Sequence, residues 1–429
     1  MKVRSVVLRI VIFVIIAFAI IIFAVLLSGC QAEKAGQTEA PQTKEASPRP
    51  KEAPQEIKIK KEEIKYEARR KEPCKAFSSG SVQNNPGESL GVLNCEIENK
   101  FPKGLRLIVD LKHDFPLDFA ASNLTAKIGD GSINVSPENN PENPNPGKMV
   151  FEIGNSNYFH TWTEMDSGTA RIKDKKGNEV VFETGPFVYS DPRFKWKEKE
   201  SENMRVLFYG STRRARPEKV LLEAERILGN FSFTPPRKIR IIVYNSRRAI
   251  DPALPFRSKA TSEDLITLGM AFGDIDAVFV LNEKDLLDTA RHELMHLIFD
   301  HLTERAFAIL PAWLNEGLAM YAGNENLSER HIKVISTSME NGKFLSLREL
   351  SSFSGKPDLV EQNYAEAHSF IRFLIKEYGQ GTMLKLLSTL NENFGMELGE
   401  AIEEVYGKAQ DSLEKEWIDG LTDRRGEVP

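Results

Sequence analysis

The sequence predicts an α+β protein, in which a disordered tether leads to a small β-sandwich domain and then to a domain whose strands come first and whose helices follow. Three observations predict this organisation. Apolar and polar residues alternate in short segments between residues 74 and 192. Short apolar strands flank one helical segment between residues 203 and 281, and nearly everything after Glu283 has helical periodicity. With 429 residues, the chain is also longer than one hydrophobic core usually fills.

The first 29 residues predict membrane attachment. A basic start precedes an apolar run that reaches Leu27, which is long enough to span a bilayer. Residues 27–30 read Leu-Ser-Gly-Cys, which resembles a bacterial lipobox, whose cysteine, here Cys30, carries the lipid. Residues 1–29 are therefore expected to be a lipoprotein signal peptide or an uncleaved anchor helix. Both alternatives place the protein at the cell membrane or envelope, on the extracytoplasmic side.

Residues 30–73 are rich in Lys, Glu, Pro and Gln, with almost no large apolar residue. Such a composition cannot bury enough apolar surface to offset the loss of chain entropy on folding. We expect a disordered linker that holds the following domain away from the membrane.

The β-sandwich is expected over residues 74–192. In residues 105–112, Leu105, Leu107, Val109 and Leu111 recur at every second position, as in a strand with one buried face. Further strand candidates are 91–96, 149–153, 170–173 and 179–183, and a turn at 175–178 joins the last two. Nothing in this sequence indicates a site, so a spacer and a substrate-presenting module both remain open.

Apart from Cys30, the chain contains two cysteines, Cys74 and Cys95. In an oxidising compartment they can form a disulfide. The alternative is two separate buried thiols. Neither has the spacing of a metal ligand.

The second domain is expected over residues 203–425. Strands are predicted at 205–209, 238–244 and 276–281, with a helical segment at 217–228. Helices are predicted at 286–303, 311–322, 328–339, 362–378, 382–393 and 409–420.

The charge balance excludes one class of partner. There are 57 Lys and Arg against 62 Asp and Glu, a net charge of −5, with no basic stripe interleaved with aromatic residues. Nucleic acid is therefore not an expected partner.

A five-residue motif carries the chemistry: His292, Glu293 and His296 form an HExxH string. On a helix, residues four apart lie on the same face, so both imidazoles can bind one metal ion while Glu293 stands beside them. No Pro or Gly interrupts residues 286–303, which supports a helix. The alternative is a helix with two incidental histidines.

A catalytic zinc site commonly has a carboxylate as its third protein ligand and leaves the fourth position for water. Residues 311–319 read Pro-Ala-Trp-Leu-Asn-Glu-Gly-Leu-Ala. Because Pro311 suits the first turn of a helix, Glu316 is expected on a second helix that can pack against the first.

Together the two motifs resemble those of the gluzincin zinc metallopeptidases, and in particular the peptidase MA-like domain family, over residues 203–425. The resemblance implies a zincin-like fold with one zinc ion per chain held by His292, His296 and Glu316. Glu293 is then the general base that takes a proton from a zinc-activated water. Asn315 and Asp300 are candidates for orienting the ligand imidazoles.

In relatives of this type a Tyr or His on a later helix stabilises the developing oxyanion. The resemblance therefore points to Tyr364, and to His368 one turn later on the same face. The alternative for Tyr364 is a tyrosine buried for its ring alone. The other histidines, His113, His160, His301 and His331, have no ligand spacing and are expected to be structural or exposed.

Residues 268–273, Leu-Gly-Met-Ala-Phe-Gly, form either a sheet edge that pairs with an extended substrate or a loop without such a role. Gluzincin aminopeptidases carry a glutamate in the comparable motif, which binds the substrate amine. Here the comparable stretch, residues 269–273, has no acidic residue, and the first one after it is Asp274. This departure favours an endopeptidase.

The main expectation is a membrane-anchored extracytoplasmic zinc metallopeptidase with peptide or protein substrates. A cell-envelope binding or scaffold lipoprotein with an idle peptidase-like domain is the alternative from another class, and a zinc-binding sensor is a third. The intact set of His292, Glu293, His296 and Glu316 favours the enzyme.

Overall fold

The computed structural model describes residues 64–66, 71–74, 89–129, 131–138, 147–156, 159–211, 216–254, 269–303, 310–353, 357–393 and 395–423. The predicted signal segment 1–29 and lipid site Cys30 lie outside these residues, as does the predicted linker up to residue 63. In the described part, no helix combines the length and the apolar character needed to cross a membrane.

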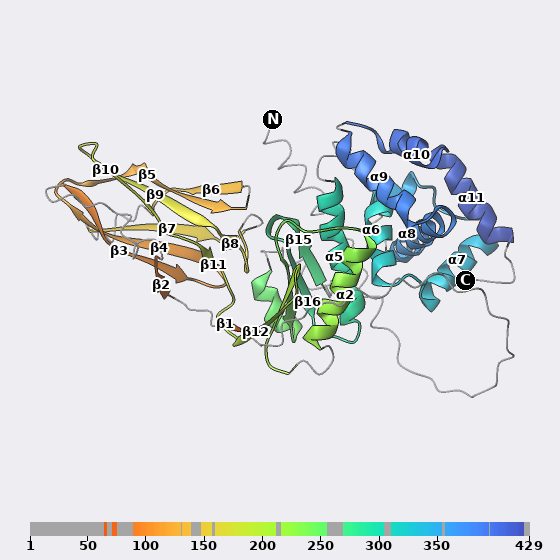
Figure 1. Ribbon diagram of the computed structural model, residues 1–429, viewed down its shortest axis with the longest axis horizontal. Helices are drawn as coiled ribbons and strands as arrows, with labels where there is room; N and C mark the ends of the chain where they lie inside the picture. Colours follow the sequence, from red (N-terminus) through yellow and green to blue (C-terminus); the bar gives the residue numbers. More distant parts are fainter. Residues whose placement is uncertain are drawn as a thin grey trace.

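Residues 71–191, which we call the β-domain, contain two four-stranded antiparallel sheets with the orders β2-β3-β4-β7 and β10-β9-β5-β6 (Figure 1). The inward residues of both sheets, among them Val109 and Ile172, are fully buried in a shared core. The strands are β2 (Lys71–Pro73), β3 (Leu90–Asn99), β4 (Gly104–His113), β5 (Leu117–Ile128), β6 (Gly131–Val135), β7 (Lys148–Gly154), β9 (Ser167–Asp174) and β10 (Glu179–Glu183). Two short strands, β8 (Glu164–Met165) and β11 (Phe187–Val188), pair beside them.

The two cysteines of the β-domain form a disulfide, Cys74–Cys95, so the first of the two alternatives is confirmed. Cys74 follows β2 directly, and its N–H donates to the carbonyl of Cys95 on β3 at 2.9 Å. The bridge therefore fixes the short strand β2 to the sheet.

The second domain is built on a six-stranded sheet with the order β1-β12-β13-β14-β16-β15. Its strands are β1 (Ile64–Tyr66), β12 (Trp196–Glu200), β13 (Met204–Phe208), β14 (Ile239–Tyr244), β15 (Gly269–Phe272) and β16 (Ala277–Leu281), with helix α2 (Pro217–Asn230) between β13 and β14. β13, β14 and β16 are parallel, and β15 returns antiparallel along one edge. Every residue of β14 and β16 is buried, because both faces of the sheet are covered.

Two expectations about boundaries are wrong. Residues 64–66 and 71–73 of the predicted linker form strands, because β1 pairs with β12 and β2 pairs with β3. The second domain also does not begin at residue 203, since β12 already belongs to its sheet. Both errors arise because edge pairing depends on a distant partner strand and leaves little trace in local composition.

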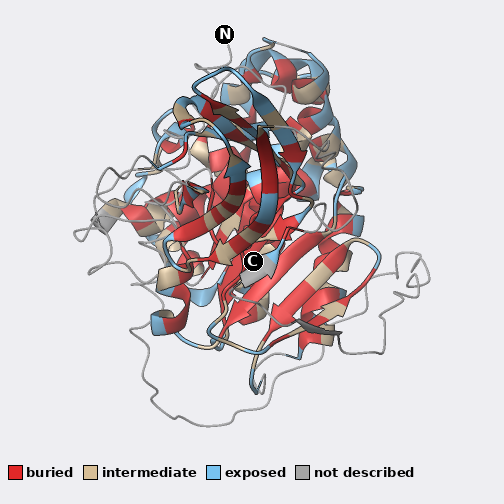
Figure 2. Ribbon diagram, turned by 90° about the vertical axis from the view of Figure 1, so that its left-hand side faces the viewer, coloured by how far each residue is buried: buried red, intermediate tan, exposed pale blue. Residues whose placement is uncertain are grey.

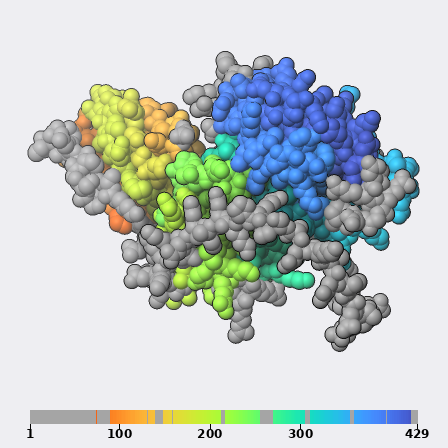
Figure 3. All heavy atoms as spheres, turned by 45° about the vertical axis from the view of Figure 1, so that its right-hand side comes forward, coloured from red at the N-terminus to blue at the C-terminus, as the bar shows by residue number. Residues whose placement is uncertain are grey.

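The helices follow the sheet, and the last of them, drawn in blue, gather at the opposite end of the molecule from the β-domain (Figure 3). They are α5 (Leu286–Thr303), α6 (Ala312–Gly323), α7 (Glu329–Asn341), α8 (Pro357–Tyr378), α9 (Gln380–Glu392), α10 (Leu398–Tyr406) and α11 (Gln410–Asp423). α7 shows ordinary helix boundaries: the Ser328 side chain accepts the His331 N–H, and Gly342 ends the helix in the left-handed region at φ 59°. Figure 2 shows buried residues mainly along the strands and inner helix faces.

The six predicted helices are confirmed, α5 with its predicted bounds. Helix α10 was not predicted, because its capping box begins with Glu397, where Ser or Thr is usual. β5 escaped because a bulge between Asp118 and Asn123 interrupts its alternation.

Candidate metal centre

Helix α5 presents the two histidines of the HExxH motif to one point. Its buried residues include Leu294, Met295 and Leu297, which anchor it in the main core of the domain. The Nε2 atoms of His292 and His296 lie 3.2 Å apart. The spacing of four residues therefore places both imidazoles on one face of the helix, as the sequence predicts.

Helix α6 adds the carboxylate. Pro311 precedes it, and Glu316 lies one turn inside with an exposed fraction of 2%. Its Oε2 is 3.7 Å from Nε2 of His292 and 3.8 Å from Nε2 of His296. One ligand atom from each of the three residues lies within 4.8 Å of the others.

The glycine that follows Glu316 allows the close packing that holds α6 in place. A Cβ on Gly317 would lie 2.6 Å from Cγ1 of Ile371 and 2.8 Å from the Ala367 carbonyl oxygen, both on α8. Because one contact is backbone, it cannot relax by a rotamer change. Because Gly317 packs directly against α8, the position of its neighbour, the candidate ligand Glu316, depends on the position of α8.

Neighbouring groups orient both imidazoles. Nδ1 of His296 makes a 2.9 Å hydrogen bond with Oδ1 of Asn315, one of the two predicted candidates. His292 hydrogen-bonds to the backbone of Ala319, a partner that no sequence pattern indicated. The other candidate, Asp300, is exposed at the end of α5, with its carboxylate beside Gly273. Fixing one ring nitrogen directs the other towards a metal.

The electrostatics of the three residues suit a cation. Burial, followed by the neighbouring His296, lowers the pKa of His292 well below its usual value, and burial lowers the pKa of His296 to about 4. Both rings are thus neutral ligands at pH 7. Burial, followed by the charge of Glu293, raises the pKa of Glu316. Among the described residues, neither Glu316 oxygen has a hydrogen-bond donor, so a bound cation would supply the compensation that burial demands. The donor set fits zinc.

Glu293 lies beside the ligands with an exposed fraction of 1%. Its side chain packs against the edge strand β15: a Cβ on Gly269 would lie 2.7 Å from Cγ and 3.0 Å from Oε1 of Glu293. Residues 269–272 form this strand, so the alternative that they are a loop is wrong. Within the part of the chain that the structure describes, β15 is the last strand of the sheet order, pairs with β16 and lies beside Glu293.

Tyr364 reaches the same region from α8. It is 1% exposed, its ring packs edge-on against Phe353 with centroids 4.9 Å apart, and burial raises its pKa well above 10. The negative charges of Glu316 and Glu293 raise that pKa further, so the phenol lies within their electrostatic range. A neutral phenol can donate a hydrogen bond.

His368, the alternative to Tyr364, lies one turn further along α8. Its ring is 5.8 Å from that of His331 on α7, and burial, followed by the charge of His331, lowers its pKa to about 3. His368 also influences His292 electrostatically. His368 thus packs against His331 of α7, whereas the charges of Glu316 and Glu293 act on Tyr364.

Three further histidines have structural partners, as expected. His301 makes a 2.7 Å contact from Nε2 to Oδ1 of Asp276, and Nδ1 of His113 bonds to the carbonyl of Phe115 at 3.0 Å. His160 is fully buried against Phe272 of β15.

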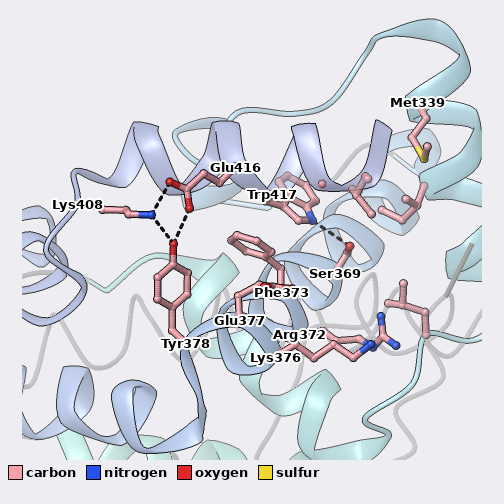
Figure 4. A pocket seen from close by; sticks show the side chains of 14 residues that line it. Met339, Ser369, Arg372, Phe373, Lys376, Glu377, Tyr378, Lys408, Glu416 and Trp417 are labelled. Carbon is pink, nitrogen blue, oxygen red and sulfur yellow. Dashed lines mark hydrogen bonds and ion pairs between the residues drawn. The ribbon is translucent and has the colours of Figure 1, made fainter. Parts of the chain in front are cut away.

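A cavity of about 450 Å³ lies elsewhere, between α7, α8 and α11 (Figure 4). Phe373 and Trp417 line it, and a network of Lys408, Glu416 and Tyr378 stands at one side. None of the three candidate ligands lines this cavity.

Residues 228–423 match the family model of the Peptidase MA superfamily. Among solved structures, the chain is similar to a mutant M1 zinc metallopeptidase from Deinococcus radiodurans, crystallised with a Tyr-Ser-Ala substrate. The identity is 11%, the TM-score is 0.37, and the match covers 75% of this chain and 91% of that one. No curated protein matches the chain.

Proposed function

We propose that this chain, which carries a gluzincin-like peptidase domain, is a zinc-dependent peptidase that hydrolyses peptide bonds. The convergence of His292, His296 and Glu316 within 4.8 Å, with Glu293 beside them, carries the proposal. Zinc, when bound there, polarises the scissile carbonyl and lowers the pKa of water.

Glu293 takes the proton of the attacking water and passes it to the leaving amine. Its position supports this role, because its Oε1 faces the edge strand β15, where an extended substrate can pair. Burial keeps bulk water away from the reacting groups, which strengthens their electrostatic interactions.

Tyr364 donates a hydrogen bond to the oxyanion that develops on the scissile carbonyl. Its support is its place: the Tyr364 side chain is buried on α8, where the charges of Glu316 and Glu293 act on it, and a phenol is a hydrogen-bond donor at neutral pH.

Endopeptidase action is the finer proposal. An aminopeptidase needs a carboxylate for the substrate amine, and β15 offers none: its residues are Gly269, Met270, Ala271 and Phe272. Phe272 is 2% exposed and packs against His160 and Phe279, so its side chain points away from the edge. A substrate that pairs with β15 therefore meets no carboxylate of this strand that could hold a free amine.

Attachment to the membrane rests on the sequence alone. The apolar run to Leu27 and the lipobox-like residues 27–30 support an extracytoplasmic protein with lipid on Cys30. Its substrates are then peptides or proteins within reach of that anchor.

The test is to measure zinc content and the hydrolysis of a quenched-fluorescent peptide mixture by the purified protein and by Glu293→Gln. We expect about one zinc per chain in both proteins, and hydrolysis about a thousandfold slower in the variant than in the wild type. Glu340→Gln, which alters an exposed glutamate on α7, is the matched control and should behave as wild type. Zinc binding without any cleavage would favour the scaffold or sensor alternative, and absence of zinc would contradict the ligand set.

A further inference from the structure

A turn of the β-domain, residues 159–163, packs into the sheet of the peptidase domain. Trp162 adopts a left-handed backbone at φ 72°, which is strained for a residue with a large side chain. Its N–H donates to the carbonyl of Tyr189, and the side chain of Thr163 bonds both the N–H and the carbonyl of His160. The β-domain thus holds the turn in one conformation.

Arg240 on β14 anchors this turn to the sheet. One of its terminal nitrogens donates to the carbonyl of Trp162 at 2.6 Å and the other to the carbonyl of Ile275 at 2.5 Å. It also forms an ion pair with Glu164 at 3.0 Å, and its exposed fraction is 6%. A buried guanidinium with three oxygen partners fixes the two domains in register.

His160 carries the contact to the edge strand. Its side chain is fully buried, and its ring centroid lies 4.1 Å from that of Phe272 on β15. Its Nε2 is 3.6 Å from Oδ1 of Asp274, just beyond the end of that strand. Phe272 in turn packs edge-on against Phe279 of β16.

The opposite face of β15 contacts the general base. Side chains alternate along a strand, so Gly269 lies on the other face from Met270 and Phe272. That glycine touches Glu293, whereas Met270 and Phe272 belong to the apolar cluster that includes Trp162. β15 is therefore held between Glu293 on one face and the β-domain turn on the other.

We propose that the turn at residues 159–163 positions β15, so that the β-domain sets the alignment of an extended substrate with Glu293. His160 is the positioning residue, because its ring supports Phe272 directly. This inference rests on the proposed peptidase function for its substrate, but the contact itself exists without turnover. The β-domain then has a role in catalysis in addition to that of a spacer.

The test compares His160→Ala with His160→Phe and with His113→Ala. The phenylalanine keeps a flat ring against Phe272. His113 is the matched control, because it lies at the far end of β4. The other end of β4 is next to Phe101, which packs against the apolar cluster of the peptidase domain. Hydrogen exchange of residues 269–272 reports on β15. Steady-state kinetics are measured on a long extended peptide and on a short peptide that spans only the scissile bond.

We expect His160→Ala to exchange faster in β15 and to raise KM for the long peptide about tenfold, with little change for the short one and unchanged zinc content. His160→Phe should restore both values, and His113→Ala should match the wild type. Unchanged exchange in His160→Ala, or faster exchange with equal losses on both peptides, would overturn the inference. If the wild type cleaves no peptide, the proposed function fails instead; the exchange data still decide whether the turn holds β15.

Discussion

Asn315 and His296 are joined by a 2.9 Å hydrogen bond between Oδ1 and Nδ1, which fixes which imidazole nitrogen faces the ligand set. Asn315 directly precedes Glu316, so one turn of α6 supplies both a ligand and the group that orients another ligand. The Asn-Glu pair of the motif therefore acts as a unit.

Replacement of Asn315 by alanine should weaken zinc binding by about ten- to a hundredfold, because His296 loses the partner that sets its orientation. Competition with a chromogenic chelator measures this affinity. Asp300→Ala is the control, because Asp300 is the sequence candidate whose exposed carboxylate lies beside Gly273. Equal affinities for the two variants would show that the hydrogen bond does not support the metal.

Gly269→Ala should lower kcat about tenfold. The new Cβ would lie 2.7 Å from Cγ of Glu293 and 2.8 Å from Cγ2 of Thr289, so the base or the strand must move. Gly273→Ala is the matched control, since its nearest neighbour is the carboxylate end of the exposed Asp300, at 3.0 Å. Steady-state kinetics of both variants on one peptide suffice, and equal kcat values would contradict the contact's importance.

Tyr364→Phe should lower kcat by a factor of about a hundred or more while KM changes little, because an oxyanion donor acts mainly in the transition state. The ring contact with Phe353 is retained, so the thermal midpoint should not fall. Tyr406→Phe, which removes a hydroxyl buried on α10, serves as control. If both variants keep full activity, Tyr364 is buried for its ring alone.

The raised pKa of the buried Glu366 carboxyl group should make the stability of the protein depend on pH. Glu366 is fully buried and accepts hydrogen bonds from Ser338, the Leu345 N–H and Gln362, yet burial raises its pKa to about 7. The folded protein therefore binds a proton that the unfolded chain releases near its ordinary pKa of 4.5. The contribution of Glu366 to the free energy of unfolding is therefore fully present below pH 4.5. It is lost as the pH rises to about 7, a decrease on the order of 3 kcal/mol.

Glu366→Gln should remove this decline. Thermal unfolding at pH 5 and pH 8 measures it: the midpoint of the wild type should fall more between the two values than that of the variant. Glu340→Gln, on the exposed face of α7, should follow the wild type. A parallel fall in all three proteins would assign the pH dependence to other groups.

The parts of the fold that local sequence determines could be predicted. α5 carries apolar residues at helical spacing without Pro or Gly, so its bounds and the convergence of His292 and His296 follow from the sequence. Glu316 and Asn315 could be found because they share one motif on one helix.

What the sequence could not predict depends on distant partners. The hydrogen bond from His292 to the backbone of Ala319 has no side chain to mark it. The contact of His160 with Phe272 joins residues of different domains, and His160 in isolation has only the pattern of a structural histidine. The pairing of β1 with β12 likewise unites segments more than a hundred residues apart.

That last pairing changes how the two folded units are connected. β1 precedes the β-domain in the chain and β12 follows it, yet they are neighbours in one sheet, so the β-domain is an insertion between two strands of the peptidase domain. A force applied through the N-terminal segment would reach the peptidase sheet first, at β1, with the β-domain attached as a side branch. A protein cut to begin at Cys74 would lose β1 and leave the backbone of β12 as an open edge, prone to association.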